Sequence, residues 1–282
     1  LRADQLAISA VPGSLMAAFR TLLLIAGWCC SLVHAAELVV AVGVQDPAQI
    51  AMQSQALPRN TPGFEMVAVN DDIAREICRR INARCSLHYV TFAEILPGVE
   101  SRRFDIGFGN FLRSPEREQR VAYSDAIWHS SSRLVGSPAA AKAFTGKLEQ
   151  AVTLDNLRGA RVIAVDGSQQ LAFLQRIAGE RGLTAIGTPA PVSAINALRD
   201  DTADFALLPI LNAYALLSHD NPQQMEFVGP AVADRGLGGS VHIVLPKQQD
   251  ELLRSVNRAI AASRADGTFQ RIVRQYFHFG LD

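Results

Sequence analysis

The sequence lacks an excess of charge, paired histidines and recognisable catalytic motifs, and each absence excludes a class of function. Lysine plus arginine and aspartate plus glutamate are equal at 27 each, so no basic excess draws the chain to nucleic acid or to an anionic membrane surface. The six histidines show no paired ligand spacing, so we expect no metal and no other cofactor. GxSxG and HExxH motifs are missing, and no nucleophilic cysteine has a plausible base nearby, which argues against an enzyme.

The composition is that of a packed soluble protein. Hydrophobic residues make up 49% and charged residues 19% of the 282 residues, which is ordinary for such a chain. This length suits one large domain or two ordinary ones. The sequence contains no low-complexity linker and no short-period repeat, so we expect folded structure over most of it.

The N-terminal segment 1–35 predicts a cleaved secretory signal. A basic start at Arg20 is followed by an apolar run of thirteen residues and by the small-residue pattern Val33-His34-Ala35. The run is shorter than the roughly 20 residues that cross a bilayer, so a permanent membrane anchor is the weaker alternative. We expect translation to begin at Met16, with 1–15 as an upstream extension, and we exclude the whole segment from fold reasoning.

Two cysteines, Cys78 and Cys85, remain after the signal is removed, and an even count suits an oxidising compartment. On one uninterrupted helix their Cα atoms would lie about 10.5 Å apart, beyond the roughly 7 Å limit for a disulfide. A disulfide therefore requires the helix to end between them, and Asn82 tolerates the left-handed conformation of such an end. The alternative is two free buried thiols.

Apolar runs alternate with helical patterns along the chain, which is typical of an α/β fold with mostly parallel sheets flanked by helices. The first unit has a strand at 38–44 and a helix over 71–83, with Ile73, Ile77 and Ile81 on one face. A second, similar unit starts with the strand at 161–167. Further elements are expected at 86–90, 105–109, 167–174, 191–200, 203–209, 240–247, 252–260 and 265–277.

Arg117 is the residue that local structure explains least. Ser114 is a good helix N-cap and Pro115 suits the first helical position, so Arg117 falls in the first turn, where the helix dipole disfavours a cation. Two α/β units favour a cleft between them, and a second helix N-terminus is expected at 167–170. Arg117 is explained if it turns into this cleft and binds a carboxylate bidentately. The alternative is a surface arginine held by Glu116, Glu118 or Asp125.

Several segments resemble one family, the family 3 bacterial extracellular solute-binding proteins. PGFEMVAVNDDIAREICRRI resembles the helix entry of that family, and FAEILPGVESRRFDIGFGNFLRSPEREQRVAYSDAIW resembles its arginine-bearing segment. The similarity continues through RVIAVDGSQQ, TADFALL and ADGTFQRIVRQYF, so it covers nearly the whole mature chain. CRRINARC is especially similar to the disulfide loop of the lysine/arginine/ornithine- and histidine-binding proteins, which implies a Cys78–Cys85 bond.

The resemblance implies a type II periplasmic binding protein fold, in which two lobes joined by two hinge strands close over a small amino acid. Lobe 1 would comprise residues 36–134 and 229–282, and lobe 2 residues 135–228. The hinge is expected near Ser132–Gly136 and Phe227–Ala231. Such a protein is periplasmic, acts as a monomer and presents its ligand to a membrane ABC permease.

The resemblance also implies a ligand site. In relatives, the arginine that matches Arg117 forms a salt bridge with the α-carboxylate of the ligand. An apolar or aromatic side chain packs on the ligand at the position of Phe92, and main-chain and hydroxyl groups contact it at Gly109 and Asn110. Ser168 and Gln169 match the second lobe's contribution to the carboxylate. Asp105 and Asp125 match framework positions.

Two departures from the family pattern concern the ligand. Relatives commonly have serine or threonine in place of Leu112, so one hydroxyl donor is missing. Pro209 stands where amino-acid binders carry an aspartate for the α-ammonium group, and burying an ammonium group without a counter-charge costs several kcal/mol. Either another carboxylate supplies the charge, with Asp46 as the candidate, or the ligand has no α-ammonium group.

Two other functions remain open at this point. The same lobe pair serves in sensory receptors, but a function as a receptor would require a separate membrane signalling partner. Cyclohexadienyl dehydratases resemble this fold as well, but their chemistry needs a positioned acid, and the sequence identifies none in the second lobe.

Overall fold

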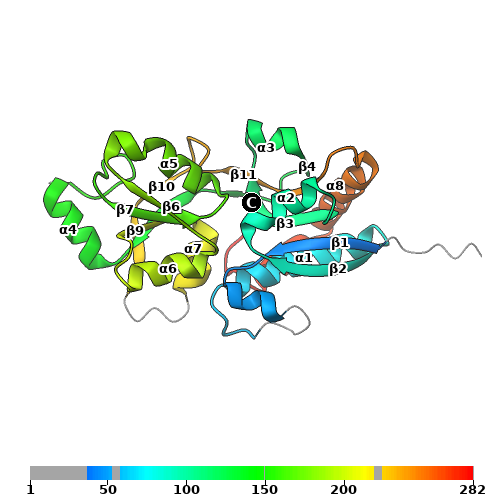
Figure 1. Ribbon diagram of the computed structural model, residues 1–282. Coiled ribbons are helices and arrows are strands. Elements are labelled where there is room, and N and C mark those ends of the chain that lie inside the picture. Colours follow the sequence, from blue (N-terminus) through cyan, green and yellow to red (C-terminus); the bar gives the residue numbers. More distant parts are fainter. Residues whose placement is uncertain (1–36, 53–57, 149, 219–223, 282) are drawn as a thin grey trace, which may run out of the picture. The chain divides into compact units, whose positions relative to one another are not determined.

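The computed structural model of the protein describes residues 37–52, 58–148, 150–218 and 224–281. The signal expected at 1–35 lies outside these residues. They form two β-sheets, each flanked by helices (Figure 1), which confirms the predicted two-sheet α/β fold. None of the helices in this described part is long and apolar enough to span a membrane.

The first sheet has the strand order β2-β1-β3-β11-β4, and β5 pairs with β11 beside β4. β1 is parallel to β2 and β3, as βα alternation predicts, whereas β11 is antiparallel to β3, β4 and β5. The sheet is therefore mixed rather than mostly parallel. Its strands are β1 (Glu37–Gly43), β2 (Arg84–Val90), β3 (Ile106–Leu112), β4 (Val121–Tyr123), β5 (Trp128–Ser130) and β11 (Gly239–Pro246).

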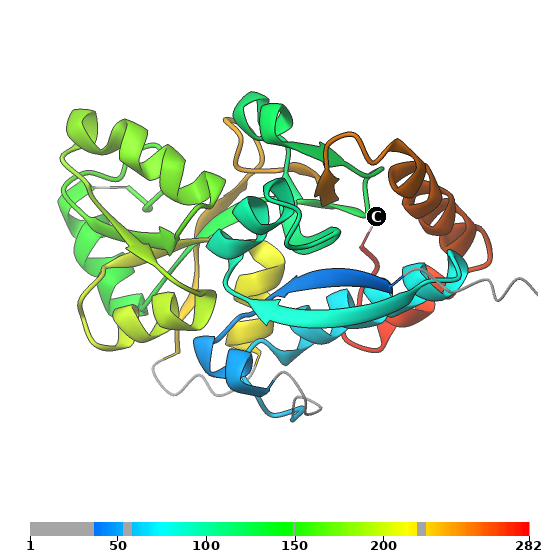
Figure 2. The ribbon, with the colours of Figure 1, turned by 45° about the vertical axis from the view of Figure 1, so that its right-hand side comes forward.

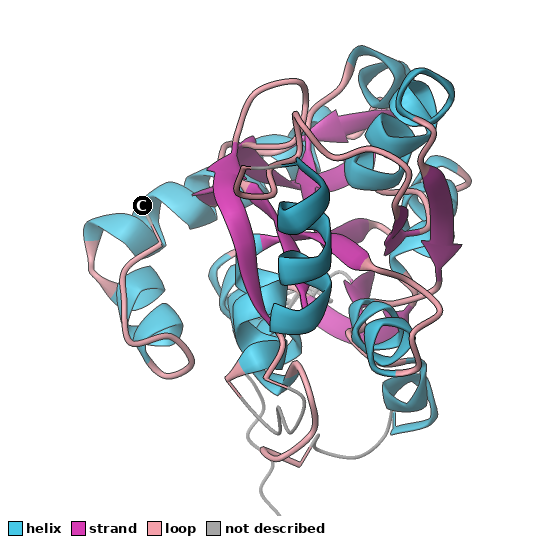
Figure 3. Ribbon diagram, turned by 90° about the vertical axis from the view of Figure 1, so that its left-hand side faces the viewer, coloured by secondary structure: helices cyan, strands magenta, loops and turns pink. Residues whose placement is uncertain are grey.

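The second sheet has the strand order β10-β6-β9-β7-β8 and is mixed as well. β7 is parallel to β8 and β9, whereas β6 is antiparallel to β9 and β10. Figure 3 shows the molecule from the side on which these strands lie, with helices packed against them. They are β6 (Ser132–Gly136), β7 (Arg161–Val165), β8 (Thr184–Thr188), β9 (Phe205–Pro209) and β10 (Glu226–Val232).

Helices cover both faces of the first sheet because its inner strand β1 is apolar on both sides. Val40 and Val42 of β1 pack in the core shared with α1 (Phe64–Arg80), α8 (Asp250–Ala265) and α9 (Thr268–Arg274). Ala41, between them, faces the opposite core, which contains α2 (Phe92–Glu100). This alternation is the period-two pattern of a strand that is buried on both faces.

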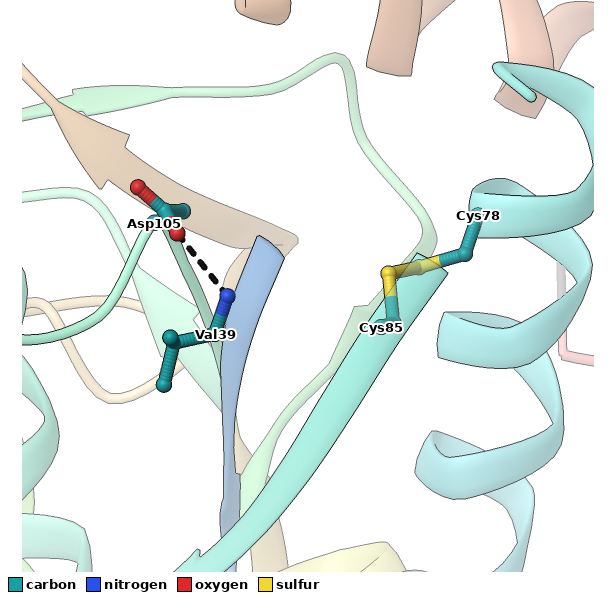
Figure 4. Close-up of a disulfide and its surroundings, with 4 residues drawn as sticks. All are labelled: Val39, Cys78, Cys85 and Asp105. Atoms are coloured by element: carbon teal, nitrogen blue, oxygen red, sulfur yellow. Dashed lines mark hydrogen bonds between the residues drawn. A yellow bond between two sulfur atoms is a disulfide. The ribbon is translucent and has the colours of Figure 1, made fainter. Parts of the chain in front are cut away.

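Shorter helices complete both parts of the fold. The 3-10 helix η1 (Pro47–Met52) follows β1, and α3 (Pro115–Arg120) precedes β4. The second sheet is flanked by α4 (Pro138–Leu148), α5 (Gln169–Arg181) and α6 (Pro191–Arg199). Asp105 acts as the expected framework residue, because its carboxylate accepts a 2.8 Å hydrogen bond from the Val39 amide and so holds the start of β1 (Figure 4).

Helix α7 (Ile210–Leu217) joins the two sheets and was not predicted from the sequence. It lies between them in Figures 1 and 2, where it is yellow. Leu211 and Ala215 pack in the core of the first sheet, whereas Ala213 and Leu216 pack in a core of the second. The chain itself passes between the sheets at Ser131 and again between Val232 and Gly239.

The Cys78–Cys85 disulfide is present and closes the turn between α1 and β2 (Figure 4). Helix α1 begins at Phe64, earlier than expected, because Gly63 caps it at a φ of 72°. It ends as predicted between the two cysteines, where Asn82 has a φ of 55°. This end brings the two Cα atoms to 6.2 Å, within the range that a disulfide can bridge.

Reducing this disulfide should lower the free energy of unfolding by about 2 kcal/mol, since the closed loop is short and the chain-entropy gain is correspondingly small. The measurement is urea denaturation with and without dithiothreitol. The Cys78→Ser/Cys85→Ser double variant serves as the control, because the reductant should not change its stability. Equal stability of the oxidised and reduced wild-type protein would count against this prediction.

Candidate functional site

Arg117 is buried, although it lies in the first turn of a short surface helix. Ser114 caps α3 as predicted, since its Oγ accepts a 3.3 Å hydrogen bond from the Arg117 amide. Only 6% of Arg117 is exposed. Its Nη1 donates to the Leu112 carbonyl at 3.0 Å, and its Nη2 donates to the Gly167 carbonyl at 2.7 Å. Residues of both sheets therefore hold one guanidinium group.

No carboxylate among the described residues forms an ion pair with Arg117. The alternative, a surface arginine held by Glu116, Glu118 or Asp125, is therefore wrong. Glu118 pairs instead with Arg113, at a nitrogen–oxygen distance of 3.7 Å. Burial lowers the pKa of Arg117, because removing the charged group from water disfavours it. The cation also lies 5.8 Å from the ring centroid of Phe92. An aromatic face offsets part of the lost hydration.

A cavity opens beside this guanidinium, and residues of both sheets line it. Every residue that the sequence analysis assigned to the ligand site lines this cavity except one. The eight are Phe92, Gly109, Asn110, Leu112, Arg117, Ser168, Gln169 and Pro209. Their roles in binding stay predictions, but their common location supports them.

Asp46 is the exception. It is not among the residues that line the cavity, and its carboxylate accepts a 2.9 Å hydrogen bond from the amide of Ala48 at the start of η1. Its backbone carbonyl accepts from Gln49 in the same turn. Local turn geometry uses this carboxylate. Asp46, the candidate counter-charge for an ammonium group, therefore does not line the cavity.

A bulge in β3 positions Gly109 and Asn110. The pairing of β3 with β11 shifts between His242 and Val244, so three residues of β3 lie opposite one of β11. Asn110 takes up this shift with a φ of 59°, a conformation that asparagine tolerates better than most residues. A Cβ atom at Gly109 would lie 2.6 Å from the Phe111 ring, so only glycine fits.

Ser168 and Gln170 lie at the start of α5, a helix that flanks the second sheet. The Ser168 hydroxyl caps this helix by accepting from the Leu171 amide at 3.1 Å. Gln170 is buried, and its Nε2 donates at 2.8 Å to the hydroxyl of Ser132, which donates in turn to the Leu237 carbonyl at 2.6 Å. This chain of hydrogen bonds ties α5 to both segments where the backbone passes between the sheets.

Gln45 and Asn212 form a second link between the two sheets. The Nδ2 of Asn212 donates to the Oε1 of Gln45 at 2.7 Å, and both side chains are buried at the cavity. The Gln45 carbonyl accepts from the amide of Val192, at the start of α6. Sequence reasoning missed both residues, although Gln45 directly follows the first strand and Asn212 lies three residues after Pro209.

Asn70 and Asn110 each have an amide oxygen that is buried and makes no hydrogen bond within the described part of the chain. Both residues line the cavity, and Asn70 is 1% exposed. Sequence reasoning missed Asn70, whose signal was a polar residue among the apolar positions of α1. An unpaired buried carbonyl oxygen costs free energy, so a hydrogen-bond donor that reached either atom would be favourable.

The geometry agrees with a match to a known family. The profile of the bacterial extracellular solute-binding proteins, family 3, matches residues 50–279. The chain belongs to this family. The match covers α1 through α9, and therefore includes every strand of both sheets except β1 and every predicted site residue except Asp46.

Several relatives of this solute-binding protein have names that state a ligand. The histidine-binding periplasmic protein of Escherichia coli (strain K12) is 25% identical over 238 residues, which cover 84% of this chain and 86% of the relative. The lysine/arginine/ornithine-binding periplasmic protein of the same strain is 24% identical over 222 residues, covering 77% and 81%.

Solved structures show the same fold. A Salmonella typhimurium periplasmic binding protein with high arginine specificity matches with a TM-score of 0.70 and 20% identity, covering 86% of this chain and 100% of that one. An ancestral arginine-binding protein bound to arginine matches with a TM-score of 0.71 and 19% identity, covering 86% and 98%. At these identities the likeness supports the fold alone.

His242 lies behind the site of this solute-binding protein, on the strand that pairs with β3. Its Nδ1 donates to the Ser124 carbonyl at 2.8 Å, while its Nε2 is buried without a partner among the described residues. Burial lowers the pKa of His242, an effect that exceeds the opposing influence of the Ser124 carbonyl. Its ring contacts Tyr123, whose hydroxyl points to the Leu112 carbonyl that also accepts from Arg117.

The free energy of unfolding should fall as the pH is lowered from 7.5 to 5.5. The unfolded chain takes up a proton on His242 near pH 6.5, whereas the folded protein resists it, so the unfolded state binds more protons in this range. One such group contributes a slope of at most about 1.4 kcal/mol per pH unit. The measurement is urea denaturation across this range.

The His242→Gln variant should lose this part of the pH dependence. His129→Gln is the matched control, because His129 is exposed on the neighbouring strand β5, where its ring lies 3.2 Å from the Ser240 hydroxyl. An unchanged slope in His242→Gln would show that another group carries the effect.

Proposed function

We propose that this protein is a periplasmic solute-binding protein of an ABC importer, which closes around a small carboxylated solute held through Arg117. The observation that carries the proposal is the buried guanidinium group, which lies at the cavity and has two carbonyl acceptors but no ion-pair partner within the described residues. A guanidinium group has five N–H donors, so donors remain for a carboxylate. A bound carboxylate would supply the missing charge bidentately.

The relatives support the transport part of this proposal. Their names describe periplasmic proteins that bind histidine, or lysine, arginine and ornithine, and others are arginine-binding proteins of ABC transporters. By this likeness, the importer is a membrane ABC permease, the protein works in the periplasm after removal of its signal, and it performs no chemistry on the solute.

The contacts between the two sheets suggest how closure works. The two lobes predicted from the sequence, each built on one sheet, would meet through the bonds of Arg117 to Gly167 and of Gln45 to Asn212. A solute that touches both lobes adds to these bonds and so favours the closed state, which the permease would recognise. Phe92, Asn110, Leu112 and Pro209 would set selectivity around the acid group.

Arg117→Ala should abolish solute binding. The wild-type protein is screened by thermal shift against L-amino acids, opines and simple organic acids, and a solute at 100 times its dissociation constant should add about 2.7 kcal/mol of stability. For the solute found, loss of a charge-assisted bidentate contact should weaken binding about 100-fold or more. Arg117→Lys should keep only part of the affinity, because lysine cannot bind bidentately.

Arg113→Ala is the matched control, since Arg113 is exposed, pairs with Glu118 and is not among the cavity residues. Its affinity should equal that of the wild type. The proposal is overturned if Arg117→Ala keeps the thermal shift, or if no carboxylate in the screen stabilises the wild-type protein.

A further inference from the structure

The cavity has one charged side chain, and that charge is positive. Among the described residues, Arg117 is the only ionisable side chain that lines it, and the others are apolar, amide, hydroxyl or glycine residues. Its two hydrogen-bond acceptors are neutral backbone carbonyls. A cationic group of a solute would therefore meet a like charge and no described counter-charge, which is unfavourable at short range and low dielectric.

Three helices add positive potential at the same place. Helices α5, α6 and α7 each begin at a cavity residue, namely Ser168, Pro191 and Pro209. None of the three has an acidic residue in its first turn. A helix N-terminus favours an anion and disfavours a cation, so these helices reinforce the effect of Arg117.

The uncharged polar side chains of the cavity indicate what else the solute carries. Asn70 and Asn110 line the cavity together with other amide and hydroxyl residues, and their buried amide oxygens have no hydrogen-bond partner among the described residues. A hydroxyl or amide N–H satisfies such an acceptor at little desolvation cost. An ammonium group could donate as well, but it would lose its hydration without gaining a counter-charge, which costs several kcal/mol.

We infer that the solute is a carboxylate without a cationic group, and that its second polar function is a neutral hydroxyl or an acylated nitrogen. This inference rests on the proposed function, because it takes Arg117 as the carboxylate anchor. It names hydroxy acids and N-acyl amino acids as the solute class, in place of the basic amino acids that give several relatives their names.

The inference can be tested with matched triads of probes that share one side chain. Each triad contains an L-amino acid, the corresponding (S)-2-hydroxy acid and the N-acetyl-L-amino acid, and the side chains include small, aromatic, acidic and basic ones. Dissociation constants are measured by calorimetry at pH 7.5. In the triad that binds, the hydroxy or N-acetyl acid should bind at least tenfold more tightly than the amino acid, and L-histidine and L-arginine should not bind.

The outcomes separate the inference from the proposed function. If an amino acid binds through Arg117 as tightly as its ammonium-free partners, the inference is wrong and the proposed function stands. If no member of any triad binds, both are wrong.

A pair of variants tests the charge argument directly. Pro209 lines the cavity and occupies the N-cap position of α7 without capping it through a side chain. Pro209→Asp introduces a carboxylate there, and Pro209→Asn introduces the neutral isostere, and both are good N-cap residues. Pro209→Asp should reduce the preference against the amino acid at least tenfold, whereas Pro209→Asn should leave it unchanged.

Melting temperatures of both variants, measured without probe, show that each is folded. An unchanged preference in folded Pro209→Asp, or an equal change in both variants, would contradict the absence of a counter-charge as the cause of the preference.

Discussion

The burial of one guanidinium group links the fold of this protein to its site. Arg117 is held by a carbonyl of β3 and by a carbonyl of the turn before α5, so its position exists only when both sheets are folded and together. Neither acceptor is charged. Within the described part of the chain, neutral acceptors therefore hold the arginine and no carboxylate pairs with it, which is the state that a carboxylate ligand would complete.

The rest of the site supplies hydrogen-bonding groups without charge. Buried amides dominate, and some of them are used internally, since Asn212 donates to Gln45 and Gln170 donates to Ser132. Others, in Asn70 and Asn110, have an oxygen without a partner among the described residues. Amide groups used internally rigidify the junction between the sheets, and we expect the remaining amides of the cavity to contact the solute.

Helix α7 and the two segments where the chain passes between the sheets determine how the sheets can move relative to each other. Alternate faces of α7 pack in the cores of both sheets, and its first residues lie at the cavity. A change in the separation of the sheets must therefore change the positions of Pro209 and Asn212. Packed helices of this kind shift between discrete arrangements, which is how small local contacts can produce domain closure.

Local sequence signals predicted a large part of the fold. The Ser114 cap, the left-handed Asn82 and the strands of both βα units depend on neighbours in the chain, and all were found. The start of α1 was missed because Gly63 caps it with a positive φ that no side-chain pattern announces. Helix α7 was missed because an apolar run that packs on two cores has no single apolar face.

The sequence by itself determined that Arg117 would lie in the first turn of α3, where the helix dipole disfavours a cation. It also determined that Cys78 and Cys85 could pair. Only the tertiary structure decided that Arg117 is buried against the second sheet, that Asp46 stays in its own turn, and that Asn70 and Gln45 reach the cavity. The physical reason is that burial, the loss of hydration and the pairing of buried polar groups depend on contacts between residues distant in the chain, which no local pattern contains.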